Sequence, residues 1–309
     1  MHAQTKTALN AISGDHNRLM AFPGGWEHHR DRHCIWIVSP KGYLHSRAFD
    51  EVALGLHFAF AELGGRAPLV TEPSNWNGRI PIVFGANLLP ANAANWLPKG
   101  TILVNLEQVS KESSWINGAY VGLLRQFPVL DYSPKNRDEL YRLGIAHAGL
   151  LRVGYSRGLT RIVHAPVKEF DVLFYGSMNE RRRDVLLALR EAGLNVGILF
   201  GVYGEERDAA IARCKMVINI HHFAAQVFEI VRVSYLLANR VCVLTEGQVD
   251  DPDLAPYAGG LASAAYDELV ARCLSLVAND DERNLLATTG FEIMGGISQA
   301  AILRETIGR

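Results

Sequence analysis

Charged and polar side chains gather between two apolar runs, over residues 221 to 232. The side chains there that could bind a ligand are those of His221, His222, Gln226, Glu229 and Arg232. Glu229 and Arg232 are three positions apart, which places them on one face of a helical turn and lets them pair. An exposed ion pair adds only about 0.3 kcal/mol to helix stability, too little to account for charges beside a core. We therefore expect Glu229 to bind hydroxyls of a ribose or sugar and Arg232 a phosphate, with a purely structural pair as the alternative.

A second candidate loop follows the apolar run Asp171–Tyr175. Gly176, Ser177 and Asn179 lie there at the start of a predicted helix, where free backbone N–H groups and the helix dipole attract an anion such as a diphosphate. Arginines at 181, 182 and 183 follow, although cations in a first turn oppose the dipole. We expect one of them, Arg181, to contact phosphate; a solvated basic face is the alternative. The sequence contains neither GxGxxG nor GxxxxGK[ST], so a nicotinamide site or a P-loop is not supported.

Polar residues also follow the apolar runs of the first half of the chain. The runs are 34–38, 80–84 and 101–105, and the polar residues after them are His45, Asn87, Asn105, Glu107 and Gln108. The carboxyl ends of parallel strands meet at one edge of a sheet, where ligands bind. His45 stands at the start of the helix predicted after the first run, where it would face a ligand at this edge, and a plain helix-start role is the alternative.

Strand and helix patterns alternate along the whole chain, which predicts an α/β fold with two parallel, doubly wound sheets. The polar segment at 166–169 suggests a boundary. We predict a first domain over residues 1–165, whose residues 1–30 form a solvated arm with His28 and His29, a second domain over 166–282, and a helical tail over 283–309 with a break at Gly295–Gly296.

Composition is that of an ordinary soluble α/β protein, with 49% hydrophobic residues, 20% charged residues and a net charge of −1. Near-neutral charge does not favour a nucleic-acid partner. The cysteines are Cys34, Cys214, Cys242 and Cys273, which form no CxxC pair and are expected as buried free thiols. No run approaches a membrane span and no leader is evident, so we expect a cytoplasmic protein.

The sequences DVLFYGSMNERRR and INIHHFAAQVFEIVRVSYLLANRVCVLTE resemble the carboxyl-terminal nucleotide-sugar-binding domain of GT-B glycosyltransferases. The resemblance covers roughly residues 130 to 280 and is greatest to the bacterial group 1 type and its spore-maturation-protein-like relatives. Family members carry E-x-F-G-x-x-x-x-E-A-x-A-x-G before a strand. Phe228 matches the motif phenylalanine, whereas the two glutamates fall on Gln226 and Ser234, the first glycine falls on Glu229, and the last falls on Asn239.

The resemblance implies two Rossmann-like domains facing across a cleft, with a last helix that crosses back to the first domain. The donor would be a nucleotide-diphosphate sugar bound by the second domain, without cofactor or metal. Its ligands would be Gly176, Ser177, Asn179, Arg181, His221, Glu229 and Arg232. His45 or Glu107 would be the general base that activates a saccharide, lipid-linked or small-molecule acceptor in an inverting transfer. A retaining transfer, which needs no such base, is the alternative. The alternatives are a non-catalytic two-domain binding protein and a glycosyltransferase that acts on a nucleic-acid base.

Overall fold

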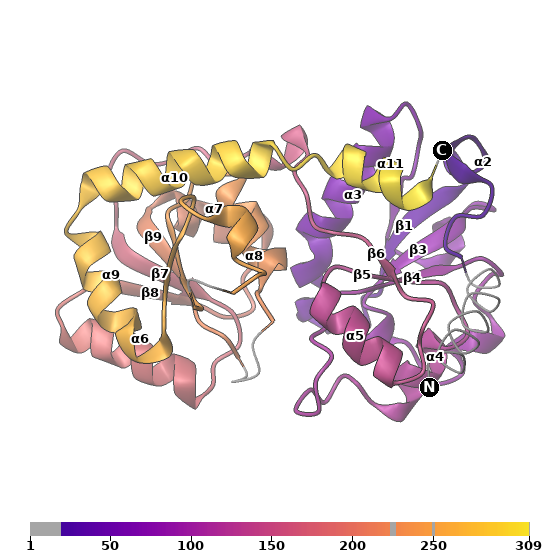
Figure 1. Cartoon of the computed structure of the whole chain (residues 1–309), viewed down its shortest axis with the longest axis horizontal. Helices are drawn as coiled ribbons and strands as arrows, with labels where there is room; N and C mark the ends of the chain where they lie inside the picture. Colours follow the sequence, from indigo (N-terminus) through magenta and orange to yellow (C-terminus); the bar gives the residue numbers. More distant parts are fainter. Residues whose placement is uncertain (1–19, 223–226, 249–250, 309) are drawn as a thin grey trace, which may run out of the picture. The chain divides into compact units, whose positions relative to one another are not determined.

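The computed structural model describes residues 20–222, 227–248 and 251–308 (Figure 1). The chain forms two compact units. Unit 1 comprises Met1–Val153 and Gln299–Arg309, and unit 2 comprises Gly154–Ser298. Each unit has one sheet whose paired strands are all parallel, with six strands in unit 1 and five in unit 2. The predicted α/β class with two doubly wound sheets is therefore confirmed.

The sheet of unit 1 has the strand order β2-β1-β3-β4-β5-β6. The strands are β1 (His33–Ile37), β2 (Leu69–Val70), β3 (Ile80–Phe84), β4 (Ile102–Asn105), β5 (Val129–Asp131) and β6 (Gly149–Leu150). The helices are α2 (Gly25–His29), α3 (Asp50–Glu62), α4 (Gly118–Leu124), α5 (Pro134–Arg142) and α11 (Gln299–Ile307), and a 3-10 helix, η1 (Leu44–Phe49), precedes α3. One buried cluster joins α2, α3 and α11 to the sheet, and another joins α4 and α5 to it.

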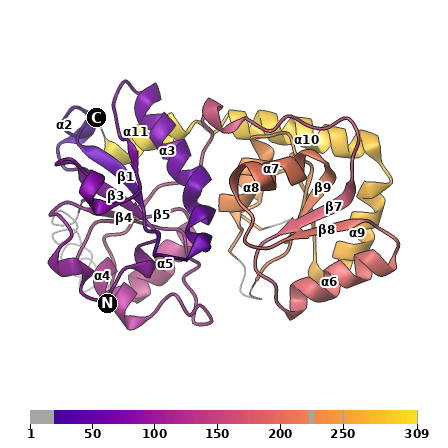
Figure 2. The ribbon, with the colours of Figure 1, turned by 180° about the vertical axis from the view of Figure 1, so that it is seen from behind.

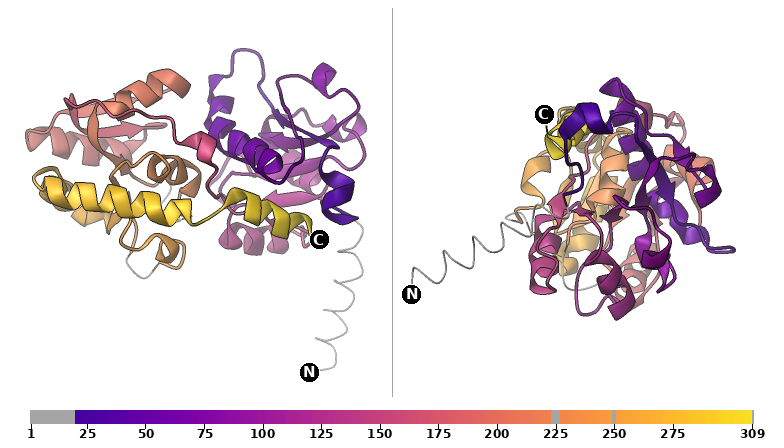
Figure 3. Two further views of the ribbon diagram at one scale, coloured as in Figure 1. Left: turned by 90° about the horizontal axis from the view of Figure 1, so that it is seen from above. Right: turned by 90° about the vertical axis from the view of Figure 1, so that its right-hand side faces the viewer.

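The last helix of the chain, α11, belongs to unit 1. It lies beside α3 in Figure 1 and in the view from above in Figure 3, and its Leu303 and Ile307 are buried in the same cluster as Phe60 of α3. The tail breaks at residues 296–298, next to the predicted glycine pair, because Gly296 ends the preceding helix. The chain thus crosses from unit 2 back to unit 1 before it ends, as the resemblance implied.

Residues 20–30 differ from the predicted solvated arm. Phe22 and Trp26 are buried, and Trp26 packs against Phe60 with ring centroids 5.7 Å apart. His29 and His33 are buried too, and His29 Nδ1 lies 2.9 Å from His33 Nε2. The prediction failed because Trp26 packs against Phe60, which is distant in sequence, and local periodicity does not reveal such a contact. Residues 1–19 of the predicted arm lie outside the described residues.

The sheet of unit 2 has the order β11-β10-β9-β7-β8. The strands are β7 (Phe170–Tyr175), β8 (Val196–Leu199), β9 (Cys214–Asn219), β10 (Val243–Glu246) and β11 (Ala262–Ala264). The helices are α6 (Glu180–Glu191), α7 (Gly204–Ala212), α8 (Ile230–Leu237), α9 (Leu269–Val277) and α10 (Asp280–Gly295). Figure 2 shows α7 and α8 on one face of the sheet and α6 with α9 on the other. β8 lies on one side of β7 and β9 on the other, so the winding reverses direction between β7 and β9.

The four cysteines are buried free thiols, as predicted. Burial raises the pKa of Cys34 to about 11 and that of Cys242 to about 12. Within the described ranges, no helix combines the length and apolar character needed to span a bilayer.

Unit 2 begins earlier than the boundary expected near residue 166, because Asn239 binds the preceding segment. Its side chain accepts hydrogen bonds from the backbone N–H groups of Arg161 (2.8 Å) and Ile162 (2.9 Å) and donates to the carbonyls of Leu159 (2.9 Å) and Tyr235 (2.8 Å). Asn239 is 2% exposed. The segment from residue 154 onward is therefore fixed to unit 2.

Replacing Asn239 by alanine is expected to destabilise unit 2 by about 2–4 kcal/mol, because four hydrogen bonds of a buried side chain are lost together. Urea unfolding followed by far-UV circular dichroism measures the loss. Asn75→Ala is the control, since Asn75 is exposed and its substitution is expected to change stability by less than about 0.5 kcal/mol. Equal unfolding midpoints for both variants would contradict the anchoring role of Asn239.

Candidate functional site

The candidate donor site lies at the carboxyl edge of the unit 2 sheet, where the winding reverses. β7 ends beside Gly176 and Ser177, β9 leads into His221, and β10 ends at Glu246. Helices α6 and α8 begin at the same edge. Open α/β sheets bind ligands at such a reversal point because two loops diverge there and leave a crevice.

Gly176 is required at this edge by its backbone and its surroundings. Its φ is +141°, and a Cβ atom there would lie 2.9 Å from Nη2 of Arg232 and 3.7 Å from Nη1 of Arg182. The Gly176 N–H already donates to the carbonyl of Leu199 at 3.1 Å. Gly176 therefore provides space beside two guanidinium groups, and its role as a diphosphate ligand stays a prediction.

Arg182 is the most buried of the three consecutive arginines. Its side chain is 2% exposed, compared with 27% for Arg181 and 56% for Arg183. Arg182 Nε donates to the carbonyl of Ile220 at 2.8 Å, and Nη1 donates to the carbonyl of Ser177 at 2.9 Å. These hydrogen bonds of Arg182 therefore connect the loop after β7 to the loop after β9. Burial lowers the pKa of Arg182 to about 10, which leaves it charged at neutral pH.

The pair predicted between Glu229 and Arg232 is present. Arg232 Nη1 donates to Glu229 Oε2 at 2.6 Å and to Asn219 Oδ1 at 2.7 Å, while Arg182 Nη2 donates to Glu229 Oε1 at 3.0 Å. Burial by itself raises the pKa of Glu229, but Arg232 and Arg182 outweigh it and hold the pKa below its usual range. Both carboxylate oxygens already accept bonds from arginine, so Glu229 orients two cations.

Arg181 is bound by a different carboxylate. Its Nη2 donates to Glu246 Oε1 at 2.5 Å, and its guanidinium lies over the Tyr266 ring, 4.1 Å from the centroid. The other oxygen of Glu246 accepts the backbone N–H of His221 at 3.0 Å. His221 is 2% exposed, and its Nδ1 has no hydrogen-bond partner among the residues that the structure describes. A buried polar atom without a partner is a natural contact for a bound ligand.

Ser177 and Asn179 lie in the turn where they were expected. Asn179 caps α6 by accepting the N–H of Arg182 at 3.0 Å, and its Nδ2 donates to the carbonyl of His222 at 2.6 Å. Ser177 Oγ lies 3.4 Å from His222 Nδ1. Gln226, on which the first motif glutamate falls, lies outside the described residues.

The charges at this edge leave a net positive site. Arg181, Arg182 and Arg232 contribute three positive charges and Glu229 and Glu246 two negative ones, so the balance is +1. The N-terminus of α6 adds the positive end of its dipole. An anion that bridges these groups would compensate the excess charge.

A second polar group lies at the carboxyl edge of the unit 1 sheet, around Glu107. Asn87, after β3, donates to Glu107 Oε1 at 3.2 Å. Burial raises the pKa of Glu107 to about 7, against the opposite effect of that hydrogen bond. A carboxylate with a pKa near neutrality is suited to accept a proton in a reaction.

Buried side chains hold the backbone of Glu107. Asn105 and Asn136 both donate to the Glu107 carbonyl at 2.9 Å. Asn105 also donates to Asp131 Oδ2 at 2.6 Å and accepts from the Tyr120 hydroxyl at 2.8 Å. This network fixes the loop that carries Glu107. His45, the other predicted base, is the second residue of η1, and its ring lies 5.4 Å from that of Tyr43.

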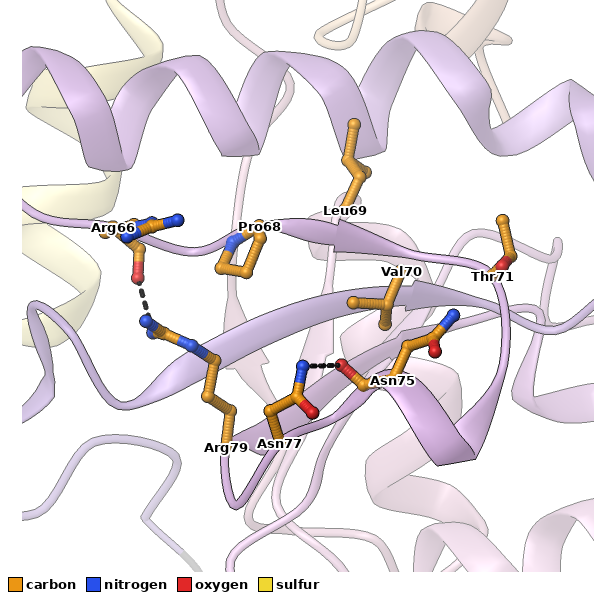
Figure 4. A pocket seen from close by; sticks show the side chains of 8 residues that line it. All are labelled: Arg66, Pro68, Leu69, Val70, Thr71, Asn75, Asn77 and Arg79. Atoms are coloured by element: carbon orange, nitrogen blue, oxygen red, sulfur yellow. Dashed lines mark hydrogen bonds between the residues drawn. The ribbon is translucent and has the colours of Figure 1, made fainter.

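A separate hollow of about 520 Å³ runs along the edge strand β2 (Figure 4). Its lining includes Arg66, Asn75, Asn77 and Arg79. Arg79 Nη1 donates to the backbone carbonyls of Asp31, His33 and Arg66, so this arginine holds neighbouring loops together. The predicted site residues lie elsewhere, at the carboxyl edges of the two sheets.

Solved structures with similar folds are found among glycosyltransferases. The Anabaena protein HepE, solved with UDP and glucose, has a TM-score of 0.60 at 11% identity over 90% of this chain and 98% of its own. AviGT4, a glycosyltransferase of avilamycin A biosynthesis, has a TM-score of 0.54 at 16% identity over 87% and 90%. The fold is that of GT-B glycosyltransferases.

Relatives by sequence come from Acanthamoeba polyphaga mimivirus. Its uncharacterized protein L140 is 29% identical over 182 residues, 58% of this chain and 59% of its own length. Another uncharacterized protein of that virus is 32% identical over 123 residues, 39% of this chain and 14% of its own. The chain thus spans less than two thirds of the length of these relatives. No family model matches the chain.

Proposed function

We propose that this protein is a glycosyltransferase that moves a sugar from a nucleotide-diphosphate sugar to an acceptor hydroxyl. The observation that carries the proposal is the group of Arg181, Arg182 and Arg232 at the winding reversal of unit 2, with its net charge of +1. Similarity to GT-B enzymes, and the UDP bound in HepE, support it. The finer resemblance to group 1 and spore-maturation-protein-like enzymes is part of this proposal.

Arg232 is the candidate ligand for the donor diphosphate, and Arg182 and Glu229 position it. Ser177, Asn179 and Arg181 lie at the same carboxyl edge of the sheet, and His221 Nδ1 offers a further polar contact. Guanidinium groups stabilise the charge that develops on a leaving diphosphate. We propose that they do so without a bound metal, in the cytoplasm.

The reaction is a single displacement at the anomeric carbon. Glu107 takes the proton of the acceptor hydroxyl as the acceptor oxygen forms its bond to that carbon. The bond from the anomeric carbon to the diphosphate oxygen breaks, and its electron pair leaves with the diphosphate. We favour Glu107 over His45 as the base because of its raised pKa and its fixed backbone.

Calorimetry against UDP-, GDP-, ADP- and CMP-linked sugars tests donor binding. We expect one nucleotide class to bind and the Arg232→Ala variant to bind it at least about 30-fold more weakly, because a charge-assisted contact to phosphate is lost. Arg240→Ala is the matched control, since Arg240 stacks on Phe291 at 3.5 Å and has no role in the proposed site. Absence of nucleotide binding would contradict the proposal. Binding without hydrolysis or transfer would favour the non-catalytic binding protein.

A further inference from the structure

Two aromatic side chains lie beside the polar group of unit 1. Tyr43 is in the loop after β1, and Trp115 is in the loop between β4 and α4. Their ring centroids are 6.5 Å apart with an interplanar angle of 73°, and the Tyr43 ring also meets the His45 ring edge to face. Tyr43 and Trp115 are half-buried, so each keeps part of its side chain open to solvent.

Tyr43 and Glu107 belong to the same site. Tyr43 follows β1 and Glu107 follows β4, so both lie at the carboxyl edge of the same parallel sheet. Burial raises the pKa of Tyr43, and the Glu107 carboxylate raises it further. Asn87, which follows the neighbouring strand β3, donates a hydrogen bond to this carboxylate. The aromatic surface thus borders the group that would accept a proton.

This combination fits a sugar ring. A pyranose has faces of C–H groups, which pack on aromatic rings, and a rim of hydroxyls, which need carboxylate or amide partners. The charged group at the centre of the cluster is a carboxylate, and it repels an anionic acceptor such as a phosphodiester. A nucleic acid would instead require cations that follow its backbone.

We propose that Tyr43 and Trp115 form the acceptor subsite and that the acceptor is a neutral saccharide. One of its hydroxyls faces Glu107 while its ring packs on the aromatic pair. This inference rests on the proposed function, but the binding of saccharide to unit 1 residues can be measured without donor.

Saturation-transfer NMR with the methyl glycosides of glucose, galactose, mannose and N-acetylglucosamine tests the subsite directly. We expect at least one probe to bind and its signal to be lost in Trp115→Ala and Tyr43→Ala, whereas Tyr43→Phe retains it. Trp96→Ala is the control, because Trp96 is 41% exposed on unit 1 and stacks on Trp76 instead. In a transfer assay, each alanine variant at 43 or 115 is expected to raise the acceptor KM about tenfold, with UDP affinity unchanged within about twofold because the donor residues lie in unit 2.

The outcomes separate the two proposals. Binding of a saccharide that is insensitive to Tyr43 and Trp115, or binding of an oligonucleotide or a polyprenyl phosphate with no saccharide bound, overturns the acceptor subsite. If the protein binds a saccharide but no nucleotide, the proposed glycosyltransferase activity is overturned and a saccharide-binding site remains. A protein that binds no neutral saccharide refutes the inference even where it hydrolyses a nucleotide sugar.

Discussion

Replacing Glu107 by glutamine is expected to lower the rate of sugar transfer by about 10²–10⁴-fold, the usual contribution of a general base. Glutamine keeps the size of the side chain and can still bond to Asn87, but it cannot take a proton from the acceptor. Donor affinity should stay unchanged within about twofold, because the donor residues lie in unit 2. Transfer is measured as release of nucleoside diphosphate with saturating donor and acceptor.

The rate of sugar transfer by the wild-type protein is expected to fall as the pH falls. Glu107 has its pKa raised to about 7 by burial and must be ionised to act. Below that value the protonated fraction grows, so the rate should fall about tenfold for each pH unit, and above it the rate should level off. The residual activity of the Glu107→Gln variant should not fall in this way at low pH, whereas the activity of the His45→Gln variant should.

Two results would contradict this role. Full activity of Glu107→Gln would exclude Glu107 as the base. Retention of the anomeric configuration, observed by NMR of the product, would contradict a single displacement, because that step inverts the carbon.

Strands and helices could be predicted from the sequence where residues that interrupt regular structure, such as glycine, bounded an apolar run. The run Ile80–Phe84 is a strand over the same residues, because Gly78 and Gly85 bound it. The pair of Glu229 and Arg232 also followed from spacing, since three positions on a helical turn fix which side chains meet. The edge strands β2 and β11 were missed because they have two and three residues, too few to show a period.

The residues of the candidate donor site were expected to follow the strands of the second domain, but their hydrogen-bond partners were not predicted. Arg182 joins the two loops, a role that the sequence analysis did not assign to any of the three arginines. A signal was present, because Arg182 precedes the buried Val185, Leu186 and Leu189 by three, four and seven positions and so lies on the inward face of α6. The bonds of Glu246 to Arg181 and to His221 join residues from separate strand ends, so no local pattern could reveal them.

Replacing Arg182 by alanine is expected to destabilise unit 2 by about 3–5 kcal/mol, the usual cost of removing one partner of a buried ion pair. The carbonyls of Ile220 and Ser177 lose the hydrogen bonds that Arg182 donates, and Glu229 loses one of its two arginine partners in the described part of the chain and keeps Arg232. Glu229 then no longer shares its negative charge with Arg182 and attracts Arg232 more strongly. Arg232 is therefore expected to bind phosphate more weakly. We therefore expect nucleotide affinity to fall by about 100-fold or more, in addition to the loss of stability.

Arg183→Ala is the matched control, one position along the same helix. Its side chain is 56% exposed and pairs with Glu180 at 3.5 Å on the surface, so its removal should change stability by less than about 0.5 kcal/mol. Urea unfolding and UDP calorimetry are measured for both variants, together with Arg182→Lys, which keeps the charge but cannot reach both loops and Glu229 at once. Similar losses in the Arg182 and Arg183 alanine variants would show that the site depends on total positive charge. A loss confined to Arg182, only partly restored by lysine, would show that it depends on the geometry of one buried guanidinium.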